Sequence, residues 1–306
     1  MYKLNHILVS LDLTEMDSFL IRYSNYIVEK FQPKTITFLH VFKSYDIPKE
    51  LMANLPDMDE PLSDIIGEEI ADNVNEHFNQ QENINMKILV EEGHTVETLV
   101  QYTKDNKIDL TLMGKKLGYE GKGSTNQKVI SLTPSSVLLI SETTQADIKH
   151  MLVRIDFTKS SEMAVKMALR LQELTKAKIS FFYVSKLPLQ YFPQHTRKNE
   201  EEIKQHIDKI SRKEYKKFMK RMKLVPDNYE FTSALDTNYD EAHVVYNQSL
   251  GVGADLIITG AGIKSGLSDV IVDSTSEKLA GSDKNISVFV VKDRKKSLGF
   301  LNKLFD

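Results

Sequence analysis

The segment from Gly114 to Thr125 contains the residue types in this sequence that are best suited to bind a ligand. It reads Gly-Lys-Lys-Leu-Gly-Tyr-Glu-Gly-Lys-Gly-Ser-Thr and lies between a predicted strand and a predicted helix. Glycines let a backbone approach a ligand closely, and the N–H groups and dipole at a helix N-terminus favour phosphate. Gly114, Gly123, Ser124 and Thr125 are therefore candidate anion-binding residues. The alternative is a surface loop whose glycines serve only as turns.

The spacing of this segment comes close to a P-loop but lacks the cation that a P-loop requires. In a P-loop, a Lys directly follows the second glycine and reaches the terminal phosphates. Here Ser124 follows Gly123, and the segment comes after the fourth predicted strand rather than the first. The sequence therefore excludes a P-loop nucleotide hydrolase.

The chain contains the surrounding pattern twice. Residues 7–12, Ile-Leu-Val-Ser-Leu-Asp, recur as residues 151–156, Met-Leu-Val-Arg-Ile-Asp. Matched positions lie about 145 residues apart, which is too long for a solenoid repeat and close to the length of one domain. The sequence therefore predicts two similar domains, residues 1–142 and 148–292, followed by an amphipathic tail, residues 293–306.

Each half alternates buried-type strands with helices. In the first half we expect strands at residues 5–11, 35–42, 86–91, 108–113 and 136–141, and helices at 16–31, 62–80, 95–105 and 125–132. In the second half we expect strands at residues 150–155, 178–184, 228–234, 255–259 and 286–292, and a long charged helix at 198–223. Such alternation predicts an α/β fold, with two tandem, doubly wound, five-stranded parallel sheets.

The carboxyl ends of the predicted strands indicate where a ligand would bind. In open parallel sheets, ligands bind outside these ends, where the strand order reverses. Asp12 follows the first strand, Val41 lies at the end of the second, and Gly114 follows the fourth. One edge of the first sheet is therefore expected to collect the candidate residues.

The composition restricts the class of protein. The 306 residues are 41% hydrophobic and 27% charged, as in soluble globular proteins. The absence of Cys excludes disulfides and thiol catalysis, and the net charge of -3 gives no reason to expect nucleic acid as a partner. We see no signal peptide and no apolar run near the roughly 18 residues that cross a bilayer. We therefore expect a cytoplasmic protein without a membrane partner.

The titratable residues do not form a catalytic pattern. The 8 histidines show no metal-ligand spacing such as His-x3-His. Asp12 and Asp156 could serve as general bases, but the sequence pairs neither with a nucleophile. We therefore do not expect an enzyme, and slow ATP hydrolysis is the last of the functions considered.

The predicted long helix of the second half carries a Lys/Arg cluster from Arg212 to Lys223. We interpret this cluster as a solvated helix face with i, i+4 charge pairs. A patch that binds an anionic partner is the alternative.

Both halves resemble the universal stress protein domain, and together they resemble the tandem members of that family. The likeness rests on the strand-Asp starts, on Val41 and Val184 near the ends of the second strands, on the Asp-Leu-x-x-x-Gly strands, and on the Gly/Ser-rich segment. The resemblance implies a Rossmann-like, adenine nucleotide alpha hydrolase-like fold. It also implies that the fifth strands pair across a pseudo-two-fold axis and that chains form homo-oligomers.

The resemblance further implies an ATP site in the first half. In the ATP-binding branch of the family, Gly-x2-Gly-x9-Gly-(Ser/Thr) wraps the phosphates, while the first-strand Asp and second-strand Val lie near the nucleoside. The residues carried over are Asp12 and Val41 for the nucleoside, and Gly114, Gly123, Ser124 and Thr125 for the phosphates. The sequence departs from the pattern because Leu117 occupies the second glycine position and the segment is shorter.

The second half departs further from this pattern. Gly260 matches the first glycine, but Ile263 and Asp273 replace the other two. A carboxylate repels phosphate, and a branched side chain lacks glycine's backbone freedom. We therefore expect any ATP to bind the first half. The resemblance implies a stress-response binding or signalling protein, whose protein partner is unidentified. The alternative is a nucleotide-independent interaction scaffold in which both sites are degenerate.

Overall fold

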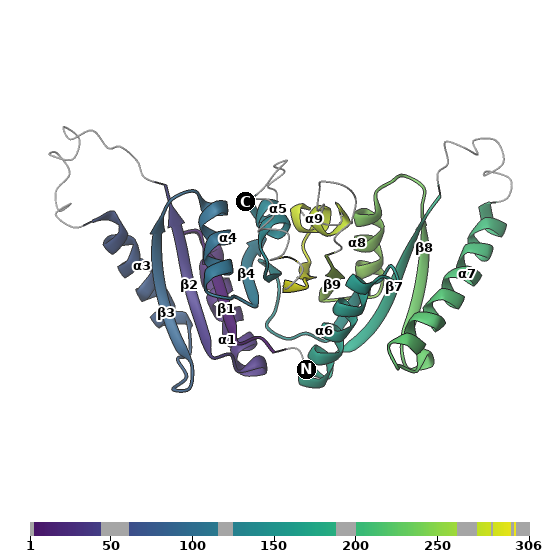
Figure 1. Ribbon diagram of the computed structural model, residues 1–306, viewed down its shortest axis with the longest axis horizontal. Helices are drawn as coiled ribbons and strands as arrows, with labels where there is room; N and C mark the ends of the chain where they lie inside the picture. The colour runs from purple at the N-terminus through teal and green to yellow at the C-terminus, as the bar shows by residue number, and fades with distance from the viewer. Residues whose placement is uncertain are drawn as a thin grey trace. The chain divides into compact units, whose positions relative to one another are not determined.

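The computed structural model describes residues 3–43, 61–115, 125–187, 200–261, 274–282, 284–294 and 297 of the chain. These residues form two compact units that divide after Ala146, and Arg294 and Ser297 group with the first unit. We call the units the first and the second domain. Each is a doubly wound α/β domain, as the sequence predicts (Figure 1).

The first domain contains a parallel sheet in which five strands follow the order β3-β2-β1-β4-β5. The strands are β1 His6–Leu11, β2 Thr35–Phe42, β3 Asn85–Glu92, β4 Leu110–Lys115 and β5 Ser136–Ser141. Helices α1 Met16–Phe31 and α3 Leu62–His77 pack against each other, as do α4 Thr95–Asp105 and α5 Thr125–Leu132. The strand order reverses between β1 and β4, so the switch point of this sheet lies between these two strands.

The second domain repeats this topology with the order β10-β9-β6-β7-β8. Its strands are β6 His150–Arg154, β7 Lys178–Lys186, β8 Glu230–Asp236, β9 Leu256–Gly260 and β10 Ser287–Val291. Its helices are α6 Lys159–Thr175, α7 Glu200–Arg221, α8 Glu241–Gly251 and α9 Ser274–Gly281, with a short 3-10 turn, η2 Pro226–Asn228. The corresponding switch point lies between β6 and β9.

The fourth strand of the first domain differs from its predicted bounds. The sequence predicts a strand at residues 108–113 and a loop from Gly114 onward, whereas β4 ends at Lys115. Gly114 pairs with Ile140 and Lys115 with Ser141 in β5, so ladder pairing extends the strand beyond the glycine. The start of the candidate anion-binding segment is therefore strand, not loop.

Among the described residues, no helix combines the length and the apolar character needed to cross a bilayer. The predicted tail lies almost entirely outside the described residues. The pairing of the fifth strands across a pseudo-two-fold axis stays a prediction.

Candidate functional site

The structure brings several of the predicted site residues to one edge of the first sheet. Asp12 follows β1, Val41 lies near the end of β2, Gly114 lies near the end of β4, and Thr125 begins α5. The parallel ladders of β1 with β2 and with β4 place the ends of these three strands side by side. Gly123 and Ser124 lie outside the described residues. The edge with Asp12, Val41 and Gly114 is thus the switch point at which open sheets bind ligands.

The loop that presents Asp12 is held by Asp17, a residue that the sequence analysis did not select. The side chain of Asp17 is buried in the first turn of α1, and its carboxylate accepts the backbone N–H of Asp12 at 3.0 Å and of Leu13 at 2.8 Å. Leu13 adopts a left-handed φ of 58° in this turn. The carboxylate of Asp12 stays exposed and accepts the Thr14 hydroxyl at 2.5 Å. Asp17 therefore positions the Asp12 carboxylate at the switch point.

Close helix packing explains the glycine near the end of the fourth strand in each domain. A Cβ atom at Gly114 would lie 2.4 Å from Cγ of Met16, the first residue of α1. A Cβ atom at Gly260 would lie 2.1 Å from the carbonyl oxygen of Ser160 in α6. Asn126, which the sequence analysis also missed, donates its side-chain amide to the Gly114 carbonyl at 2.8 Å. Gly114, assigned to phosphate through the resemblance, thus has a structural requirement as well.

In the second domain, a buried ion network occupies the carboxyl edge. The Arg154 guanidinium, at the end of β6, donates through Nε and one terminal nitrogen to Oε1 of Glu241, each at 2.7 Å. Lys186 Nζ lies 2.9 Å from Oε2 of Glu241, and the Thr275 hydroxyl donates to that oxygen at 3.0 Å. The residues Arg154 and Glu241 are 6% and 5% exposed. We call Arg154, Lys186, Glu241 and Thr275 the edge network.

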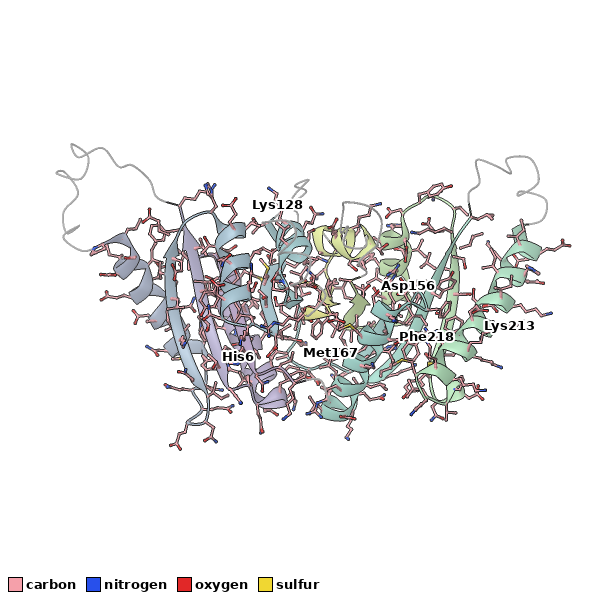
Figure 2. All side chains as sticks on the ribbon, viewed as in Figure 1. His6, Lys128, Asp156, Met167, Lys213 and Phe218 are labelled. Atoms are coloured by element: carbon pink, nitrogen blue, oxygen red, sulfur yellow. The ribbon has the colours of Figure 1, made fainter. Side chains whose placement is uncertain are left out.

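The edge network stabilises the charged form of two carboxylates. Burial by itself would raise the pKa of Glu241, but the charges and hydrogen bonds of Arg154 and Lys186 outweigh it and lower that pKa. Asp156, which follows β6 (Figure 2), behaves similarly. Burial again acts to raise its pKa, and the Arg154 charge with hydrogen bonds from Ser161 and Thr158 lowers it overall. Both side chains are therefore ionised at neutral pH.

These two pKa shifts predict how stability depends on pH. A carboxyl whose folded pKa lies below its unfolded pKa contributes stability above the unfolded value, and that contribution is lost as pH falls through the folded value. We expect the second domain to lose stability progressively below about pH 4.5. Urea midpoints measured between pH 7 and pH 3 test this. The double variant Arg154→Met with Glu241→Leu should show a smaller fall of the urea midpoint at acid pH. An unchanged fall would contradict the assignment of this pH dependence to the two carboxylates.

The first domain has different side chains where the second domain has the edge network. The matched positions are Ser10 for Arg154, Lys43 for Lys186, Thr95 for Glu241 and Thr125 for Thr275. Hydroxyls thus replace the arginine and the glutamate, so these four positions cannot form the buried pair that fills the second edge. Of these four positions in the first domain, one holds a cation, the exposed Lys43, which directly follows the strand that carries Val41.

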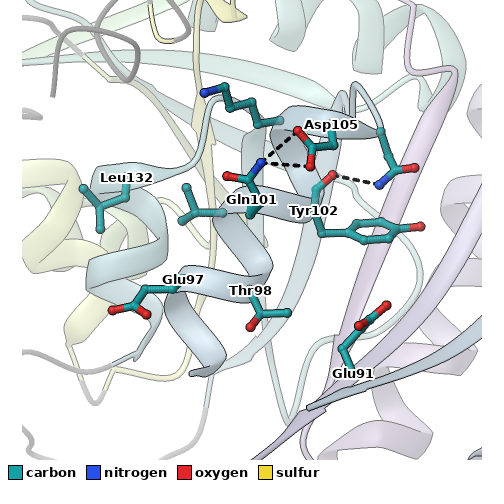
Figure 3. Close-up of a pocket in the computed structure, with 10 residues that line it drawn as sticks. Glu91, Glu97, Thr98, Gln101, Tyr102, Asp105 and Leu132 are labelled. Atoms are coloured by element: carbon teal, nitrogen blue, oxygen red, sulfur yellow. Dashed lines mark hydrogen bonds between the residues drawn. The ribbon is translucent and has the colours of Figure 1, made fainter. Parts of the chain in front are cut away.

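A separate groove of about 600 Å³ runs beside α4 of the first domain (Figure 3). Tyr102, Val100 and Leu132 contribute apolar surface, and Asp105 accepts two hydrogen bonds from the Gln101 amide at 2.8 and 2.9 Å. None of the described site residues lines this groove. Within the described ranges, no group of three or more Asp, Glu or His side chains could hold a metal ion.

A doubly wound parallel sheet with a switch point defines a Rossmann-like α/β domain, and this chain contains two of them. The sequence matches the universal stress protein family over residues 3–141 and again over residues 147–292. The chain therefore belongs to the universal stress protein family and carries two of its domains in tandem.

Solved structures share this fold over nearly the whole chain. A functionally unknown protein from Pseudomonas aeruginosa PAO1 is 12% identical with a TM-score of 0.66, and the match covers 98% of this chain and 96% of that one. A universal stress protein from Archaeoglobus fulgidus DSM 4304 is 16% identical with a TM-score of 0.63, covering 95% of this chain and 97% of that one. No curated protein matches the chain. At these identities the likeness establishes the fold and nothing more.

Proposed function

We propose that this protein is a stress-response binding or signalling protein whose first domain binds ATP and whose second domain does not. Occupancy of the first site would change the surface offered to a protein partner. The adenine nucleotide follows from the family resemblance, and the choice of domain follows from the side chains at the two edges.

The observation that carries the choice of domain is the edge network. A nucleotide at the second edge would have to displace a buried Arg154–Glu241 pair, and both charges would lose these contacts of 2.7 Å. Glu241 would also repel phosphate, as an acidic side chain does at close range. The first edge has Ser10 and Thr95 at these positions, so a ligand there meets hydroxyls instead of an ion pair.

The contacts that remain at the first edge suit a nucleoside. Asp12 is an exposed carboxylate in a loop fixed by Asp17, and a carboxylate is a strong acceptor for ribose hydroxyls. Val41 is buried near the end of β2 and offers an apolar contact for a base. We assign no catalytic step to these residues.

Titration of the full-length protein with ATP by calorimetry tests this proposal. We expect one ATP per chain. Asp12→Asn should raise the Kd about tenfold, because loss of a hydrogen bond to a charged acceptor costs about 1.5 kcal/mol. Asp156→Asn, the matched change in the second domain, should leave the Kd unchanged. A stoichiometry of two, or weaker binding in Asp156→Asn alone, would overturn the assignment to the first domain.

The second candidate is a nucleotide-independent interaction scaffold in which both sites are degenerate. The packing of Met16 against Gly114 favours it, because this glycine is required whether or not a phosphate binds. Acid extraction of freshly purified protein separates the two functions. ATP-binding predicts co-purified or titratable nucleotide, and the scaffold predicts neither.

A further inference from the structure

Five exposed lysines form a stripe along α7 and the turn that follows it. They are Lys209, Lys213, Lys216, Lys220 and Lys223. Their spacing alternates between four and three residues, which keeps all five on one side of a helix with 3.6 residues per turn. The opposite side packs inward through the buried Tyr215, Phe218 and Met219. Figure 2 labels Lys213 on the outer side of α7 and Phe218 on its inner side. We call these five residues the lysine stripe.

Three other cations of this helix have acidic partners. Arg212 pairs with Asp208, Lys217 with Glu214, and Arg221 with Glu162, each at 2.7 Å. The first of these contacts is an i, i+4 pair of the kind expected from the sequence for a solvated helix. Among the described residues, no carboxylate lies within ion-pair distance of a lysine in the stripe. Like charges three and four residues apart destabilise a helix, so a complementary surface would relieve this repulsion.

The first domain carries such a surface on α3, its counterpart of α7. The exposed carboxylates of α3 are Asp64, Glu68, Glu69, Asp72 and Glu76, and this helix contains no Lys or Arg. In the described part of the chain, none of these five has a cation within ion-pair distance. We call them the acidic face. At a rise of about 1.5 Å per residue, the acidic face is about 18 Å long and the helical part of the lysine stripe about 17 Å.

The two halves of the chain also differ in net charge, with the same signs as the two faces. Residues 1–146 contain 13 Lys and Arg against 22 Asp and Glu, a net charge of -9. Residues 147–306 contain 27 against 21, a net charge of +6. Each face also presents one isoleucine directly after its first charged residue, Ile65 at 38% and Ile210 at 50% exposure. The two faces thus match in length, in opposite charge and in the position of an apolar contact.

We propose that the lysine stripe of one copy of this protein binds the acidic face of a second copy. Because each copy carries both faces, the contact is heterologous and can continue from one copy to the next. An association built on exposed charges is weak and is screened by salt, since the Debye length is about 10 Å at 0.1 M. The chain's overall net charge of -3 favours a second copy over a polyanion such as nucleic acid or an anionic membrane. The inference does not depend on nucleotide binding.

Sedimentation velocity of the full-length protein, over a range of concentrations at about 30 mM and 300 mM NaCl, tests this contact. We expect a mass that rises with concentration at low salt and an association constant about tenfold lower at high salt. The triple variant Lys213→Glu, Lys216→Glu, Lys220→Glu should remain at its high-salt mass. So should the triple variant Glu68→Lys, Asp72→Lys, Glu76→Lys. All six changes in one chain exchange the charges of the two faces, so this variant should associate again.

The six-change variant has the net charge of the wild type, which controls for general electrostatics. Lys87→Glu, Lys128→Glu and Lys166→Glu together match the charge change of the lysine-stripe variant at exposed positions elsewhere, and should associate as the wild type does. Three outcomes would overturn the proposal: no association of the wild type at low salt, no recovery in the six-change variant, or equal loss in the control. Stripe-dependent binding of duplex DNA or anionic vesicles by a wild type that does not self-associate would also overturn it.

Discussion

Replacement of Glu241 by alanine should destabilise the second domain by about 3–5 kcal/mol, the typical cost of removing one partner from a buried ion pair. Glu241 is 5% exposed and holds the Arg154 guanidinium through two contacts of 2.7 Å. Its loss removes these two short contacts from a buried positive charge, which keeps the Asp156 carboxylate at 3.7 Å. Lys186, whose side chain is 51% exposed, regains water instead and adds little. Urea unfolding of the full-length protein, followed by circular dichroism, measures the loss.

The double variant Arg154→Met with Glu241→Leu separates the cost of an orphaned charge from the value of the pair. Removal of both charges in favour of apolar side chains of similar volume is often neutral or stabilising. We therefore expect the double variant to be markedly more stable than Glu241→Ala. A loss below about 1 kcal/mol in Glu241→Ala, the range of exposed ion pairs, would contradict the burial of the edge network.

Gly260→Ala should destabilise the second domain by about 3 kcal/mol, at the upper end of the usual cost of overpacking. The added Cβ would lie 2.1 Å from the backbone carbonyl of Ser160, so helix α6 must shift away from the sheet. Gly114→Ala in the first domain should cost less, about 1 kcal/mol. There the closest atom, at 2.4 Å, belongs to the Met16 side chain, which can change rotamer. Thermal unfolding of the two single variants tests this order.

Equal costs for the two alanine variants would contradict the packing explanation of these glycines. A loss of ATP binding in Gly114→Ala without any loss of stability would instead assign Gly114 to the phosphates. The two measurements therefore distinguish a packing glycine from a ligand-binding glycine at the same position.

The fold was predictable because its signals are local and occur twice. The first helix is observed at the predicted bounds, Met16–Phe31. It was predictable because its apolar periodicity is clear and the residues that flank it do not continue the helix. The fourth strand was misplaced because Gly114 and Lys115 have no strand propensity of their own. Their pairing with Ile140 and Ser141 extends the strand, and sequence periodicity does not report such partners.

The candidate site was predictable only in part. Asp12, Val41 and Gly114 follow from the rule on strand ends, and the structure places all three at the carboxyl edge of the first sheet. Asp17 was not predicted as a site residue because a polar residue in a first helical turn usually faces solvent, whereas Asp17 is 2% exposed. The edge network was not predicted because Arg154 and Glu241 lie 87 residues apart in the sequence and come into contact only when β6 and α8 pack together.

The charged surface of α7 was also predictable only in part. Charge pairs four residues apart were expected, and Arg212–Asp208 is one, whereas Glu214 and Lys217 pair at a spacing of three. That the lysine stripe faces away from the domain depends on the rotation of the helix against the sheet. That rotation is set by Tyr215, Phe218 and Met219, and it became known only with the structure.

Hydrogen–deuterium exchange of the full-length protein, with and without saturating ATP, tests most directly whether the two edges have diverged. We predict slower exchange in the backbone around Asp12 and Val41 when ATP is present, and unchanged exchange around Arg154 and Lys186. ATP-dependent protection at the second edge, or protection at neither edge, would contradict the account.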